Sequence, residues 1–106
     1  MKTYTIKLTE HAAADLKALR DYIAQTLHEP ETGRRKVGHI LEEIKSLSFL
    51  PQRNALMPTE PERSSGIRKT VAENHYILYT IDADTVQILR VIYSSCDLIQ
   101  RLRSGR

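Results

Sequence analysis

The sequence has little cysteine, little glycine and no long apolar run, and each shortage excludes a class of protein. The single cysteine, Cys96, excludes an internal disulfide framework and a cysteine-rich zinc site. The four glycines are scattered along the chain, which leaves no glycine-rich phosphate-binding loop. No apolar run approaches the roughly 20 residues that span a bilayer, and residues 1–8 lack the apolar core of a signal peptide. We therefore expect a cytoplasmic protein with no membrane contact.

Residues that bind metals or act as nucleophiles are also sparse. The histidines fall on separate predicted elements, with no i, i+4 pair and no His-Glu-x-x-His run. They are His11, His28, His39 and His75. Cys96 lies just past the last predicted strand, but its sequence neighbours supply neither the base nor the positive environment that a reactive thiolate needs. We therefore expect no metal site, no cofactor and no cysteine nucleophile.

The formal net charge of +3 is concentrated at one end of the chain. Residues 98–106 hold Arg101, Arg103 and Arg106 and no acid, so the other 13 of the 16 basic residues balance the 13 acidic ones. A chain of 106 residues has room for one domain. We divide it into a neutral domain over residues 1–97 and a basic C-terminal tail over 98–106. A neutral body with one phenylalanine and no tryptophan lacks the broad basic surface of a nucleic-acid-binding domain.

Hydrophobic periodicity predicts the order of the elements. Residues 3–8 alternate apolar and polar, which predicts a half-buried strand. Apolar residues then recur at helical spacing over 10–27 and again from Pro30 to about Leu50, with a break at His28-Glu29-Pro30. Residues 51–66 are rich in proline and serine and predict a surface loop. Three strand-like runs follow, over 67–72, 76–81 and 86–93, separated by short turns.

This order predicts an α+β fold. A short break between two amphipathic helices favours an antiparallel helical hairpin. Three strands joined by short turns favour an antiparallel meander, which forms one sheet with the first strand. We expect the helical hairpin to cover one face of that sheet.

The strands hold the residues that suit an anionic or protein partner. Arg68 and Lys69 open the second strand on opposite faces. Arg90 interrupts an otherwise apolar strand, and alternation places it on the face of Val86, Ile88 and Ile92. A long cation in mid-strand either pairs with an acid or lies on an exposed face for an anionic partner, and both interpretations stay open.

Tyrosines accompany these cations on the predicted sheet. Tyr76, Tyr79 and Tyr93 lie in its strands, and His75 precedes the middle one. Strand tyrosines usually border a core with the hydroxyl in water, whereas a ring beside a cation suits contact with a partner.

Taken in order, the sequence resembles the RelE/ParE superfamily of toxins from bacterial type II toxin–antitoxin pairs, and the resemblance covers nearly the whole chain. The motifs, in order, are Ala-x-x-Asp-Leu (12–16), Asp-Tyr-Ile (21–23), Leu-x-x-Pro-Glu (27–31), Ile-x-x-Leu-x-x-x-Pro (44–51), Gly-Ile-Arg (66–68), an asparagine before Tyr79, and Ile-Leu-Arg-Val-Ile-Tyr (88–93). The resemblance implies a helical hairpin packed on an antiparallel sheet. It also implies a cognate antitoxin that wraps and neutralises the toxin in a hetero-oligomeric complex.

Two toxic activities occur in that superfamily, namely cleavage of messenger RNA on the ribosome and inhibition of DNA gyrase. Metal-free RNA cleavage needs a base, an acid and cations that stabilise the developing phosphorane. In the RNA-cleaving branch we expect an arginine just before the apolar-apolar-tyrosine of the middle strand and a basic residue or histidine after the last strand. Here Tyr76 and Ser94-Ser95-Cys96 stand in those places. The sequence therefore resembles the ParE-like branch more closely.

Three functions stay open on the sequence. The first is a ParE-like toxin that binds a protein target such as DNA gyrase, in plasmid stabilisation or growth inhibition, without acting as an enzyme. The second is a ribosome-dependent, metal-independent endoribonuclease, for which the candidate catalytic residues are Arg68, Lys69, His75, Arg90 and Tyr93. The third is a fold relative that only forms complexes. The candidate residues for binding a target or an antitoxin are Arg68, Tyr76, Arg90, Tyr93, Arg101 and Arg103.

Overall fold

The computed structural model describes residues 2–95 and 98–104, so the expectation for Cys96 lies outside the described residues. The chain begins with strand β1 (Thr5–Leu8) and passes directly into helix α1 (Glu10–Asp21). Thr9 caps this helix, because its hydroxyl accepts a hydrogen bond from the amide of Ala12 at 3.1 Å. A π-helical turn, η1 (Tyr22–Thr26), prolongs α1, which confirms the predicted helical segment to within one residue.

The break between the helices lies where the sequence predicts it. His28 adopts a left-handed backbone with φ of 55°, and Pro30 is the first residue of helix α2 (Pro30–Ser46). The second helix was predicted to reach about Leu50, but it ends four residues earlier. Residues 47–49 instead donate i→i−3 bonds, and Leu50 takes φ of 48° ahead of a short 3₁₀ turn, η2 (Pro51–Arg53).

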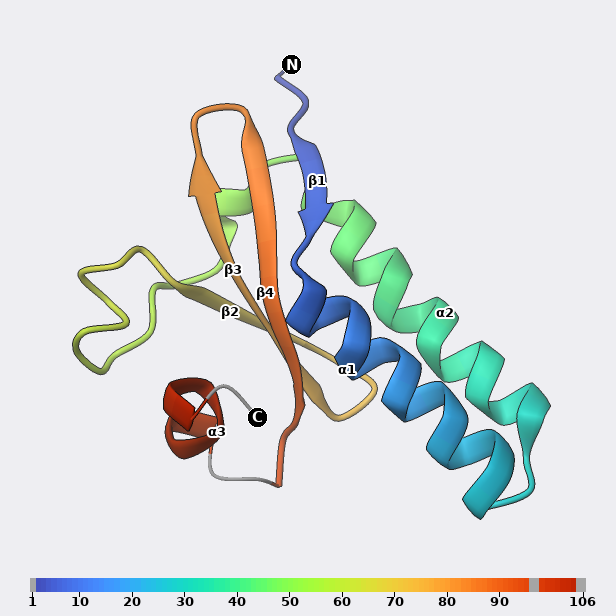
Figure 1. The fold of residues 1–106 in the computed structure, drawn as a ribbon. Helices are drawn as coiled ribbons and strands as arrows, with labels where there is room; N and C mark the ends of the chain where they lie inside the picture. Colours follow the sequence, from blue (N-terminus) through green and yellow to red (C-terminus); the bar gives the residue numbers. More distant parts are fainter. Residues whose placement is uncertain (1, 96–97, 105–106) are drawn as a thin grey trace.

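The sheet is four-stranded and mixed. Strands β2 (Arg68–Ala72), β3 (His75–Asp82) and β4 (Thr85–Tyr93) form the predicted antiparallel meander. The strand order is β1-β4-β3-β2, and β1 lies parallel to β4 (Figure 1). The two residues of the first hairpin turn, Glu73 and Asn74, both have positive φ, which matches the right-handed twist of the flanking strands. The predicted α+β architecture is confirmed.

The hairpin of α1 and α2 covers one face of the sheet and encloses the main core (Figure 1). Its buried members include Ala12, Leu16, Ile40, Ile44, Leu47, Ile77, Tyr79, Val86, Ile88 and Val91. The opposite face bears a smaller cluster of Met57, Leu78 and Ile92. Residues 98–104 of the predicted tail form a third helix, α3 (Leu98–Ser104), whose apolar side chains pack against this second cluster.

A β-bulge changes the predicted orientation of Arg90. The register between β3 and β4 shifts at Leu78 and Tyr79, so that one extra residue of β4 is accommodated near Leu89. Val86 and Ile88 therefore face the helices, whereas Arg90 is opposite Leu78 on the α3 side. The prediction that Arg90 shares a face with Val86 and Ile88 is wrong, because strict alternation does not allow for a bulge, whereas Ile92, beyond the bulge, does lie on the same side as Arg90.

Candidate partner-binding groove

Arg90 makes a buried ion pair with Asp15, across from it on α1. The Arg90 side chain is 6% exposed and that of Asp15 is 14% exposed. Nε and Nη2 of Arg90 donate to the two carboxylate oxygens of Asp15 at 2.9 and 3.1 Å, in a bidentate arrangement. A further bond of 3.4 Å links Nη1 to the carbonyl of Arg101 in α3. Of the two interpretations of Arg90, the structure has the ion pair.

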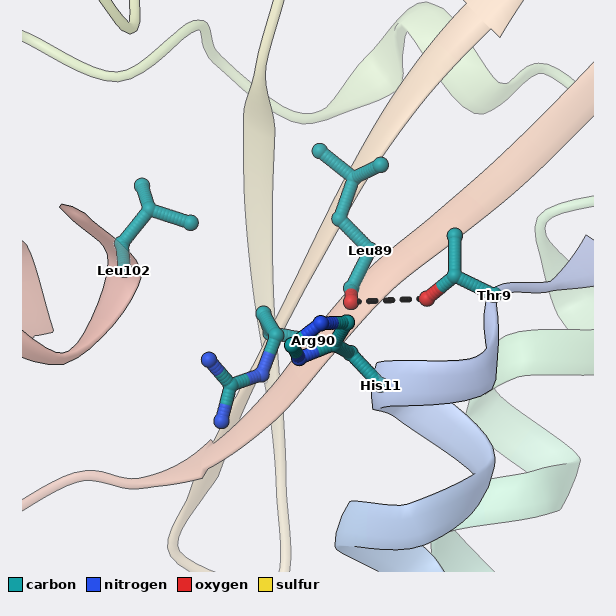
Figure 2. A pocket seen from close by; sticks show the side chains of 5 residues that line it. All are labelled: Thr9, His11, Leu89, Arg90 and Leu102. Atoms are coloured by element: carbon teal, nitrogen blue, oxygen red, sulfur yellow. Dashed lines mark hydrogen bonds between the residues drawn. The ribbon is translucent and has the colours of Figure 1, made fainter. Parts of the chain in front are cut away.

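The same carboxylate also closes part of the edge of β4. Oδ2 of Asp15 accepts the backbone amide of Val91 at 2.9 Å. Six residues earlier, the hydroxyl of Thr9 donates to the carbonyl of Leu89 at 2.9 Å (Figure 2). The start of α1 thus substitutes for a neighbouring strand just beyond the end of β1.

A small apolar pocket of about 230 Å³ lies beside this junction, between the start of α1 and α3. Figure 2 shows the five residues that line it, which are Thr9, His11, Leu89, Arg90 and Leu102. Its volume is smaller than the roughly 300–1,000 Å³ of typical ligand sites, and it suits one inserted side chain.

A larger groove, of about 810 Å³, opens at the far end of the helical hairpin, where its tip faces the ends of β3 and β4. Its apolar lining includes Tyr22 and Leu27 from the hairpin tip and Tyr93 from β4, with exposed fractions of 54%, 47% and 49%. His75 and Tyr93 lie across from each other with ring centroids 5.4 Å apart. The groove therefore presents three half-exposed aromatic or apolar side chains to solvent.

Charged side chains surround this groove unevenly. Two acids in its lining already face a cation or histidine, since Asp15 binds Arg90 and the carboxylate of Glu73 is 3.4 Å from the His39 ring. Lys36 from α2 and Arg101 from α3 also line it, and among the described residues neither makes an ion pair. Glu29, at the hairpin tip, is the third acid in the lining. The groove thus presents two cations to whatever occupies it.

The remaining basic candidates on the sheet lie elsewhere and already have partners. Arg68 is on the helix side, where its Nη1 donates to the carbonyl of Asn54 at 2.5 Å. Lys69 lies on the opposite face, with its ammonium 4.5 Å from the centre of the Tyr76 ring. The predicted placement of Arg68 and Lys69 on opposite faces is therefore confirmed, and the two do not form one site.

Beneath Arg68, a buried polar network joins the sheet to the loop after α2. The hydroxyl of Tyr79 donates to the carbonyl of Pro51 at 2.7 Å and accepts from the side chain of Asn54 at 3.0 Å. Burial raises the pKa of Tyr79 above its ordinary value, so the phenol stays protonated and keeps its donor. Tyr79 is a core residue and does not border solvent.

In the C-terminal helix, Arg103 is held by the loop before β2. Its Nε and Nη2 each lie 3.0 Å from a carboxylate oxygen of Glu62, and Nη2 also donates to the carbonyl of Glu60 at 2.7 Å. The Glu62 side chain is only 4% exposed. The Arg103 guanidinium, with help from the hydroxyl of Thr59, lowers the pKa of Glu62 to about 2. Arg103 therefore fixes α3 in place.

Three residues at these sites were not among the sequence candidates, namely Asp15, Glu62 and Lys36. Asp15 lies within the Ala-x-x-Asp-Leu motif, on a helix whose neighbouring positions are apolar, and a lone acid there is the one local signal for a buried partner. Glu62 and Lys36 give no such signal, because each is one charged residue among several in its segment.

The described part of the chain offers neither a metal-binding cluster nor a membrane-spanning helix. It has no group of three or more histidine, cysteine, aspartate or glutamate side chains that could hold a metal ion. It also has no helix long and apolar enough to cross a membrane.

Comparison with known families identifies the fold. The profile described as "ParE toxin of type II toxin-antitoxin system, parDE" matches residues 6–98, from β1 to the start of α3. This chain belongs to the ParE toxin family. The match spans the ion pair, nearly all of the four strands and the groove lining apart from Arg101, whereas it leaves out most of α3.

Solved structures of toxin–antitoxin systems are similar to this ParE-family chain. The chromosomal ParDE system from P. aeruginosa is 29% identical with a TM-score of 0.72, over 88% of this chain and 98% of that one. The toxin–antitoxin complex RelBE2 from Mycobacterium tuberculosis is 28% identical with a TM-score of 0.65, over 88% and 93%. The YoeB dimer from Staphylococcus aureus shares the fold, at 18% identity and a TM-score of 0.59 over 86% and 97%. No curated protein sequence matches the chain.

Proposed function

We propose that this chain is the toxin of a type II toxin–antitoxin module, that a cognate antitoxin neutralises it, and that it acts by binding a protein target such as DNA gyrase. Membership of the ParE family supports the toxin assignment. The P. aeruginosa and M. tuberculosis neighbours, described as a toxin–antitoxin system and a toxin–antitoxin complex, support the antitoxin.

The dispersal of the candidate nuclease residues is the observation that favours protein binding over RNA cleavage. Arg90 is buried against Asp15, Arg68 donates to a loop carbonyl, and Lys69 is on the opposite face of the sheet. A phosphoryl-transfer site needs its base, acid and cations within hydrogen-bond reach of one phosphate. Of the five candidates, only His75 and Tyr93 share a surface.

The experiment is induced expression of the chain in a bacterial host, with two readouts taken in the same culture. A gyrase-directed toxin activates a DNA-damage reporter and causes filamentation while translation continues. Immediate arrest of translation, with messenger RNA cut in the ribosomal A site, would overturn the proposed target and favour the endoribonuclease. Growth without arrest would leave a chain that only forms complexes.

A matched pair of variants sharpens this test. His75→Ala removes the only histidine in the groove, and Tyr93→Phe removes only a hydroxyl. Tyr93→Phe, which keeps the aromatic ring in the groove, should remain toxic if the chain acts by binding a protein. Loss of toxicity in both, with the protein folded and soluble, is the result expected of a catalytic pair.

A further inference from the structure

The turn after α2 displays two large apolar side chains in succession. Phe49 is 47% exposed and Leu50 is 63% exposed, the highest fraction among the large apolar side chains of the described chain. Figure 1 shows this end of α2 beside β1, far from the hairpin tip. The groove takes Thr32 and Lys36 from the first half of α2, and the 17 residues of this helix span roughly 25 Å. The turn is therefore a surface of its own, away from the groove.

The backbone of Leu50 is strained. Its φ of 48° and ψ of 55° lie in the left-handed region, where a side chain beyond glycine is crowded. In the described part of the chain, four other residues besides glycine have a positive φ, and none of them has a large apolar side chain; they are His28, Glu73, Asn74 and Ala83. Asparagine tolerates this conformation better and suits water better. Neither the local backbone nor burial accounts for a leucine at this position.

The contacts around the turn hold it in this conformation. Nη1 of Arg53 donates to the carbonyls of Ser46 and Phe49 at 3.2 and 2.6 Å, and its Nη2 donates to the hydroxyl of Ser46 at 2.8 Å. On the other side, Pro51 is buried, and its carbonyl accepts the hydroxyl of Tyr79 at 2.7 Å. A strained conformation persists only where its surroundings determine it in this way, and such residues cluster at functional sites.

We propose that Phe49 and Leu50 form an apolar turn that inserts into an apolar pocket on the protein target. A turn that is already rigid loses little conformational entropy on binding, which is the advantage that offsets its strain. Aromatic and apolar side chains suit the buried centre of a protein interface, whereas nucleic-acid phosphates are bound by cations and polar groups. This inference rests on the proposed function for the identity of the partner as a protein target.

Asparagine at position 50 provides a specific test. Leu50→Asn removes the apolar side chain and places a residue that tolerates the left-handed backbone, so Tm should stay the same or rise. Phe49→Ser removes the neighbouring ring. Leu41→Gln is the matched control, because it replaces a leucine that is 42% exposed on α2 by a polar residue of similar helix propensity. Circular dichroism and thermal melting verify the fold of all three variants.

The probe is purified DNA gyrase, titrated with each purified variant, and growth arrest after induced expression is measured in parallel. Leu50→Asn and Phe49→Ser should each weaken binding about tenfold or more and lose growth arrest, whereas Leu41→Gln should match the wild type. Wild-type affinity and toxicity in both turn variants would overturn the inference. If the wild-type chain arrests growth without binding gyrase, the named target falls, and loss of arrest in the turn variants still supports the apolar turn. A wild-type chain that causes no arrest would overturn both proposals.

Two further measurements separate the target from other occupants of the turn. Binding to the antitoxin encoded in the neighbouring reading frame should be unchanged in Leu50→Asn and Phe49→Ser, and an equal loss there would assign the turn to the antitoxin. A concentration-dependent dimer that Leu50→Asn dissolves, measured by sedimentation, would assign it to a second copy of the chain. Either result would overturn the target as occupant. A variant with undiminished Tm and weakened target binding is the outcome that a merely structural role does not produce.

Discussion

Replacing Asp15 by alanine should be among the most damaging single changes in α1. The carboxylate accepts three hydrogen bonds, two from the Arg90 guanidinium and one from the Val91 amide. Asp15→Ala removes the carboxylate that binds this guanidinium, which is 6% exposed, through two hydrogen bonds, and it leaves an edge amide without an acceptor. Breaking a buried ion pair from one side costs about 3–5 kcal/mol. Because the Asp15 side chain is 14% exposed, we expect the lower end, about 3 kcal/mol.

This loss is large for a domain of this size. Small domains are stable by about 5–15 kcal/mol, and each kcal/mol shifts Tm by roughly 4–8 °C. Asp15→Ala should therefore lower Tm by about 12–24 °C. Urea unfolding followed by circular dichroism gives the free energy of unfolding directly. The double variant Asp15→Ala with Arg90→Met should lose less than the sum of the two single variants, because each single variant already breaks the direct interaction between the two side chains.

The same helix supplies a control. Asp21 lies 3.5 Å from Arg20, and these side chains are 40% and 52% exposed. Asp21→Ala should change stability by no more than about 0.5 kcal/mol, as for other surface pairs. If Asp15→Ala and Asp21→Ala unfold at the same urea concentration, the buried pair does not contribute as argued. Additive losses in the double variant would likewise refute the coupling.

Three further predictions concern the rest of the fold. The pKa of Glu62 is about 2 in the folded chain, against an ordinary value of about 4.5. Its contact with Arg103 therefore stabilises the fold fully above about pH 4.5, and this contribution is lost as the pH falls towards 2. Glu62→Gln should flatten the dependence of Tm on pH between these values, and an unchanged dependence would contradict the role given to Glu62. Tyr79→Phe should cost about 1–3 kcal/mol in urea unfolding, because it leaves a buried carbonyl and amide without their hydroxyl. Gly66→Ala should destabilise the fold by about 1 kcal/mol, because φ is +80° at this position. Gly38→Ala should instead stabilise the fold by up to about 1 kcal/mol, because a methyl group at this position of α2 meets open space. Shifts of Tm of the same sign in the two variants, measured by calorimetry, would refute this contrast.

Local patterns predicted most of the fold. Apolar residues at helical spacing placed α1 and α2, and the short turns placed β2, β3 and β4 in a meander. The end of α2 was missed because the apolar pattern continues through Leu47 and Leu50, where the backbone has already turned. Periodicity reports which residues are apolar, and it does not report where a left-handed residue and a proline end the hydrogen-bond ladder.

The sites were harder to predict because they depend on contacts between distant parts of the chain. His75 and Tyr93 were candidates, and pairing of β3 with β4 places them together. Lys36 and Arg101 reach the same groove from α2 and α3, elements that no local pattern connects. Arg103 was a candidate for binding a target or an antitoxin, and in the structure the carboxylate of Glu62, 41 residues earlier, binds its guanidinium.

The sequence by itself determined the order of the elements, the α+β class and the resemblance to the toxin family, because periodicity, turn residues and motif order are local properties. Only the tertiary structure decided the role of Arg90. One bulge residue in β4 turns its side chain to the face opposite Val86 and Ile88, and the early end of β1 lets Asp15 reach it around the strand edge. Because β1 ends at Leu8, opposite Ile88, no strand of the described chain lies beside Val91 and Tyr93 at that edge of the sheet.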